Sequence, residues 1–97
     1  MVNLEEIKKD KGYHVSTKTT EFFDLRIVTD SKHKTPSVFI YTLTNPTYYL
    51  GHIKFYGSWR KFVFHPACDT LFDSKCLTEI INIINELQTS WKNKEFN

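Results

Sequence analysis

The side chains best suited to chemistry lie in the second half of the chain: His52, His65, Cys68 and Cys76. Imidazole and thiolate are the ligands that zinc prefers, so this set is first tested as a zinc site. Two residues separate His65 from Cys68 and seven separate Cys68 from Cys76, a spacing that matches no common pairing of zinc ligands. The sequence therefore predicts no metal and no cofactor, and a metal-binding protein remains an alternative.

Cys76 is also a candidate nucleophile, because the start of a helix lowers the pKa of a thiol. The same position suits a small apolar side chain that faces the core. The acidic pairs Glu5-Glu6 and Asp69/Asp73 fit helix starts and caps better than acid–base catalysis. Phosphate-binding glycine loops, zinc-protease motifs and nucleophile elbows are absent from the sequence. We therefore expect a protein that is not an enzyme, with a small enzyme kept as an alternative.

Composition indicates one domain over residues 1–97, since the chain is too short for two independent cores. Apolar residues make up 40% and aromatic residues 15%, enough to close a core. The net charge of +2 is lower than that of most dedicated nucleic-acid-binding proteins of this size. The start of the chain lacks a signal-like pattern and no apolar run reaches membrane length, so we expect a cytoplasmic protein without membrane contact.

Aromatic and basic residues concentrate in two predicted strands, 48–56 and 59–65. Gly57-Ser58 between them suits a two-residue hairpin turn. That turn would place Tyr56 opposite Trp59 and Lys54 opposite Lys61, an arrangement in which like charges repel.

The alternation of side chains then divides the hairpin into two faces. One face is predicted to form the core under a helix, with Gly51 leaving room for a neighbouring ring: Ile53, Phe55, Phe62 and Phe64. The other face is aromatic and basic: Leu50, His52, Lys54, Tyr56, Trp59, Lys61, Val63 and His65.

This second face predicts a partner-binding site, formed by His52, Lys54, Tyr56, Trp59 and Lys61. A solvated sheet face whose lysines keep the protein soluble is the competing interpretation. Rings beside cations suit a protein partner, through buried anchor residues, and also nucleic acid, through stacking and phosphate contacts. The modest net charge favours a protein partner, with nucleic acid as the alternative; the sequence leaves the oligomeric state open.

The remaining elements complete an α+β fold, in which an antiparallel meander of about four strands carries a C-terminal amphipathic helix on one face. Further strands are predicted over 22–29 and 37–44, while residues 13–20 fit a weak edge strand or a loop equally well. A short N-terminal helix is predicted between Asn3 and Gly12, and Asp73 is expected to cap the C-terminal helix. Its predicted buried stripe comprises Leu77, Ile80, Ile81, Ile84, Leu87 and Trp91.

The hairpin also carries a resemblance. The stretch from Tyr49 to Pro66, including Gly-x-Ile-Lys-x-Tyr-x-x-Trp-Arg-Lys, followed by Phe72-Asp73 and Cys76-Leu77, resembles small uncharacterised proteins of phages, mobile elements and bacterial genomes. The resemblance covers roughly the C-terminal half of the chain. It implies a small accessory gene product and no mechanism. Together with the aromatic and basic face of the hairpin, this context leads us to expect binding to a host protein, for example one of nucleic-acid metabolism or defence, in the host cytoplasm if the chain is phage-encoded.

Overall fold

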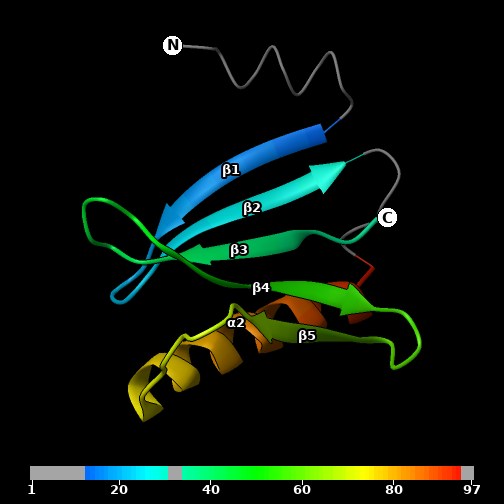
Figure 1. Cartoon of the computed structure of the whole chain (residues 1–97). Coiled ribbons are helices and arrows are strands. Elements are labelled where there is room, and N and C mark those ends of the chain that lie inside the picture. The colour runs from blue at the N-terminus through cyan, green and yellow to red at the C-terminus, as the bar shows by residue number, and fades with distance from the viewer. Residues whose placement is uncertain (1–12, 31–33, 95–97) are drawn as a thin grey trace.

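The described part of the chain folds into a five-stranded antiparallel sheet with one helix packed against one of its faces (Figure 1). The computed structural model describes residues 13–30 and 34–94. Neighbouring strands in the sheet are neighbours in the chain, so the sheet is a meander. Its elements are β1 (Tyr13–Thr19), β2 (Asp24–Asp30), β3 (Ser37–Tyr41), β4 (Tyr49–Tyr56), β5 (Lys61–Pro66) and α2 (Ser74–Lys92).

The predicted α+β class, the antiparallel meander and the C-terminal helix are confirmed. The predicted number of about four strands is wrong, because the polar segment after residue 12 forms β1. This segment pairs with β2 from Tyr13↔Asp30 to Thr19↔Asp24, and its Thr-rich sequence suits an edge strand that pairs on one side only. The predicted N-terminal helix lies outside the described residues.

The core lies between the sheet and α2, on the face to which alternate residues of the strands point. Ile40 and Ile53, on the central strands β3 and β4, have no exposed surface. The predicted core residues Ile53 and Phe62 are confirmed as buried, and Phe55 and Phe64 pack against them as partly buried neighbours. The buried core comprises Phe23, Leu25, Val38, Ile40, Ile53, Phe62 and Ile80.

The helix α2 begins as predicted, since the Asp73 carboxylate accepts a hydrogen bond from the Cys76 backbone N–H at 2.8 Å. Its buried stripe differs from the prediction at two positions. Leu77 is 42% exposed and Ile81 is 54% exposed, whereas Ile83, which was not predicted, packs on the core. A single helix lying on a sheet buries a narrow stripe, and these two side chains project beside it. The side chains that do pack are Cys76, Ile80, Ile83, Ile84, Leu87 and Trp91.

The connection from β4 to β5 is a four-residue turn, Gly57 to Arg60, and the predicted two-residue turn is wrong. The Trp59 N–H donates to the Tyr56 carbonyl and the Arg60 N–H donates to the Gly57 carbonyl, each at 3.2 Å. Arg60 closes the turn in a left-handed conformation with φ of 55°. The longer turn shifts the register by two residues, an even number, so the paired residues from His52 to Tyr56 and from Lys61 to His65 keep the faces predicted for them by alternation.

The turn is fastened to the helix by Gln88. Its Oε1 accepts a hydrogen bond from the Phe62 N–H at 3.1 Å, and its Nε2 donates to the Arg60 carbonyl at 3.2 Å. The Arg60 guanidinium also lies over the Trp91 ring, 5.5 Å from its centroid. The end of the hairpin and the last turns of α2 therefore form one packed unit.

Candidate binding face

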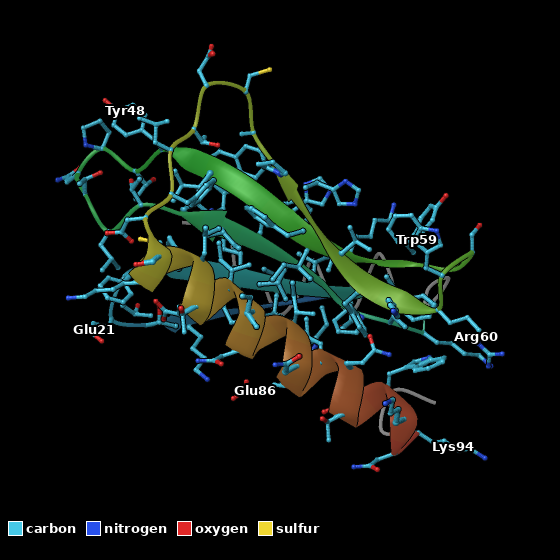
Figure 2. All side chains as sticks on the ribbon, turned by 90° about the horizontal axis from the view of Figure 1, so that it is seen from below. Glu21, Tyr48, Trp59, Arg60, Glu86 and Lys94 are labelled. Carbon is cyan, nitrogen blue, oxygen red and sulfur yellow. The ribbon has the colours of Figure 1, made fainter. Side chains whose placement is uncertain are left out.

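The candidate site is the side of the sheet that points away from α2, which we call the open face. Figure 2 views the molecule with the helix below the sheet: Trp59 lies on the side of the hairpin away from the helix, and Arg60 lies toward its C-terminal end. The open face is defined by the strand residues Arg26, Val28, Phe39, Tyr41, Tyr49, His52, Lys54, Tyr56, Lys61, Val63 and His65, together with Trp59 of the turn.

A β-bulge in β4 brings Tyr49 onto the open face. Ile40 pairs with Gly51 but the next residue of β3, Tyr41, pairs with Tyr49, so Leu50 is an extra residue in the ladder. Leu50 packs against the core, and its predicted place on the open face is wrong. Gly51 permits this geometry, because it adopts φ of 150° and a Cβ there would lie 2.5 Å from the His65 carbonyl oxygen and 2.9 Å from the Phe64 ring. The prediction that Gly51 leaves room for the Phe64 ring is confirmed.

Five rings from three strands form a continuous cluster on the open face. The Tyr49 ring contacts those of Tyr41 and Phe39, with centroids 5.7 Å and 6.4 Å away. The rings of Tyr49, His52 and His65 are nearly parallel, with interplanar angles of 16° and 14° and centroid steps of 6.4 Å and 4.8 Å. A 2.6 Å hydrogen bond joins Tyr49 Oη to His52 Nδ1. These contacts hold the rings in a defined arrangement, and no other element within residues 13–30 and 34–94 covers them.

A second aromatic pair stands at the end of the hairpin. Tyr56 and Trp59 meet edge to face with ring centroids 4.8 Å apart. Tyr56 is 44% exposed and Trp59 is 63% exposed. Large rings that remain this exposed beside one another are uncommon on surfaces without a binding role.

Cations flank both groups of rings. The Arg26 guanidinium lies 4.7 Å from the centroid of the Tyr41 ring. Lys54 and Lys61 are exposed, but the predicted pairing of the two lysines is wrong, because Lys54 lies opposite Val63 and Lys61 opposite Tyr56. The four-residue turn thus separates two like charges that a two-residue turn would have opposed.

The environment of the ring cluster shifts the pKa values of two of its members. Desolvation lowers the pKa of His52, and the nearby His65 and Lys54 lower it further by charge repulsion. Desolvation, with a smaller contribution from Tyr41, raises the pKa of Tyr49. Both shifts favour the neutral side chains, so the hydrogen-bonded pair is uncharged at neutral pH.

The residues predicted from the sequence as the partner-binding site are brought to the same side of the hairpin. His52, Lys54, Tyr56 and Lys61 lie on the open face, and Trp59 joins them through its contact with Tyr56. Their role in binding stays a prediction. Four neighbours were missed: Arg26, Phe39, Tyr41 and Tyr49. The alternation of Phe39 and Tyr41 with Val38 and Ile40 was a signal that could have found two of them.

The residues considered for chemistry do not assemble into a further site in the described part of the chain. Within residues 13–30 and 34–94, no group of three or more metal-ligating side chains comes together. Cys68 and Cys76 are both free thiols. Burial and the Asp73 carboxylate raise the pKa of Cys76, opposite to the shift that a nucleophilic thiol requires. None of the helices in the described ranges has the length and apolar character needed to cross a membrane.

Comparison with known proteins gives a phage relative. The "Uncharacterized 9.3 kDa protein" of Acholeplasma phage L2 is 40% identical to this chain over 43 residues, which cover 44% of this chain and 55% of the phage protein. The match thus spans about half the length of that relative. No family model matches the chain, and no solved structure matches it. The similarity agrees with the resemblance to small phage proteins noted in the sequence.

Proposed function

We propose that this chain is a small, non-enzymatic accessory protein of the phage type that binds a macromolecular partner through the open face. The observation that carries the proposal is the ring cluster of Phe39, Tyr41, Tyr49, His52 and His65, which is ordered by its own contacts and covered by no described element. The water-facing side of an antiparallel sheet is usually polar. An aromatic surface in that position is typical of an interaction site.

The composition of the open face supports the same conclusion. Tyr, Trp and Arg are the residues most enriched among those that dominate binding energy at interfaces. Here Tyr49 is 41% exposed and Trp59 is 63% exposed, and Arg26 lies over the Tyr41 ring on the same face. Because ring contacts already restrict Tyr49 and His52, a partner would lose little free energy in ordering them.

The phage relative supports the biological setting of the proposal. A phage accessory protein would meet its partner in the cytoplasm of the host cell. The 40% identity over 43 residues suggests a related role for the shared part of the two chains.

The proposal is tested by binding measurements on matched variants. The chain is immobilised, partners are captured from host-cell extract, and each purified partner is titrated with the parent protein, Trp59→Ala, Tyr49→Ala and Leu71→Ala. Leu71 is 95% exposed and lies outside the open face, so it controls for the loss of an exposed apolar side chain. We expect Trp59→Ala or Tyr49→Ala to raise Kd by about tenfold or more and Leu71→Ala to leave it unchanged. Partners that bind equally well to all three variants would contradict the proposal.

A further inference from the structure

We infer that the partner of the open face is single-stranded nucleic acid, with bases stacked on the rings and phosphates held by Arg26, Lys54 and Lys61. The inference rests on the proposed function and names the class of its partner. It reverses the preference for a protein partner that the net charge of +2 suggested.

The open face carries three exposed cations that can hold phosphates: Arg26, Lys54 and Lys61. The described residues of β4 and β5 include no acid, and two acids occupy the same alternating positions of β2 as Arg26: the half-buried Asp24, opposite Tyr41, and Asp30, opposite Tyr13. On α2, lysines and glutamates are mixed: Lys75 and Lys92 with Glu79 and Glu86. The small net charge of the chain does not prevent phosphate binding at the hairpin, because it is the local field that attracts phosphates.

The geometry of the rings suits unpaired bases. Tyr49, His52 and His65 form a nearly parallel series that ends at β5, an edge strand, so no described strand lies beyond the exposed His65 ring. Flat rings standing on a sheet accept unpaired bases by stacking, and this contact tolerates any sequence because every base has a π-face. Tyr56 and Trp59 offer a second stacking position farther along the same hairpin.

The exposed rings also favour single strands over duplexes. In a duplex the faces of the bases are already stacked on one another, so the rings of the open face would have nothing to contact. A duplex binder instead inserts a helix or a ribbon into a groove. Here the only described helix, α2, packs its apolar stripe on the sheet, and the rings lie on the opposite side.

The inference is tested by fluorescence anisotropy with labelled oligothymidylate, oligouridylate and a mixed-sequence duplex over a range of salt concentrations. We expect the single strands to bind at low salt and the duplex to bind more weakly. With phosphates at the three cations, log Kd should rise with log salt with a slope of about 2. Lys54→Ala should lower that slope by about 0.7, whereas Lys75→Ala, an exposed lysine on α2, should leave it unchanged.

Ring variants separate stacking from charge attraction. Tyr49→Ala should weaken single-strand binding about tenfold, while Tyr49→Phe, which keeps the ring and loses the hydrogen bond to His52, should retain most of it. Circular dichroism and thermal melting check that each variant is folded. The inference is overturned if single strands do not bind at low salt. It is also overturned if the duplex binds more tightly than the single strands and Tyr49→Ala leaves the Kd for the duplex unchanged. If no oligonucleotide binds but a purified protein binds and loses affinity with Trp59→Ala, the inference is overturned and the proposed function stands.

Discussion

The two faces of this sheet both carry aromatic side chains in contact with one another, but the two sets differ in burial. On the helix side, Phe62 meets the Phe55 ring edge to face and is only 4% exposed, because it lies in the core under α2. On the open face, Tyr49 and His52 are held by ring contacts and a hydrogen bond while water reaches them. Burial contributes roughly 25 cal/mol per Å² of apolar surface, so stability depends chiefly on the helix side. The open face can therefore change in sequence with little effect on folding, and we propose binding as the reason for its aromatic content.

The largest expected effect is on the free energy of unfolding, and it compares adjacent residues of β4 that point to opposite faces. Ile53→Ala removes a fully buried side chain and should lower the free energy of unfolding by about 3 kcal/mol, with Ile53→Val costing about 1 kcal/mol. Lys54→Ala, one residue along on the open face, should change it by less than about 0.5 kcal/mol. Urea denaturation measures all three. A similar loss for Lys54→Ala would show that the open face also contributes to stability.

The next effect concerns the glycine that permits the bulge. Gly51→Ala forces a Cβ to within 2.5 Å of the His65 carbonyl oxygen at an unfavourable φ, so we expect a loss of about 2 kcal/mol and a displaced Tyr49 ring. Gly57→Ala is the matched control, because nothing lies within 4 Å of a Cβ at that position. Chemical denaturation gives the energies, and two-dimensional NMR contacts between Tyr49 and His52 report the ring. If both alanine variants retain these contacts, the bulge does not position Tyr49.

A smaller effect is expected where the helix meets the hairpin. Gln88→Ala removes both hydrogen bonds to the backbone of the hairpin, at Arg60 and Phe62, and should cost about 1 to 2 kcal/mol. Asn85→Ala, on an exposed position of the same helix, serves as the control and should be nearly neutral. Thermal melts compare the two. Equal melting temperatures would mean that these bonds add nothing to stability.

The smallest expected effect is the pH dependence contributed by the open face. The pKa of His52 is lower in the folded protein than the usual 6.5, so the unfolded chain binds more protons just below that pH. Stability should therefore be full above pH 6.5 and fall slightly as the pH drops through this value. His52→Phe should remove this part of the loss, as measured by urea denaturation at pH 7.5 and 5.5. If His52→Phe loses as much stability between pH 7.5 and 5.5 as the parent, His52 does not contribute to the pH dependence.

Sequence reasoning succeeded for face alternation and failed for local backbone conformation. The faces of the β4–β5 hairpin could be predicted because side chains alternate strictly, and an even shift in register leaves that alternation intact. The turn itself could not, since Gly57-Ser58 suits a tight hairpin and nothing in Arg60 signals φ of 55°.

The candidate site was found only in part for the same reason. An extra residue at Leu50 reverses the face of Tyr49, and a bulge of this kind leaves no periodic signal in the sequence. Arg26 and Tyr41 meet only after β2 and β3 pair, so their contact depends on a register that sequence alone did not supply. On α2, Ile81 is apolar but lies beside the buried stripe. The sequence does not distinguish such a residue from one inside the stripe, because the distinction depends on how the helix lies on the sheet.

The attachment of Gln88 to the hairpin has a thermodynamic consequence for any ligand that binds at Trp59. Since the carbonyl of Arg60, next to Trp59, is tied to α2, a ligand that immobilises this tip must also suppress local opening of the final helical turns. Amide hydrogens near Trp91 should then exchange more slowly in the complex, although Trp91 belongs to the helix and not to the open face. Protection of these helical amides would thus serve as an independent reporter of ligand binding.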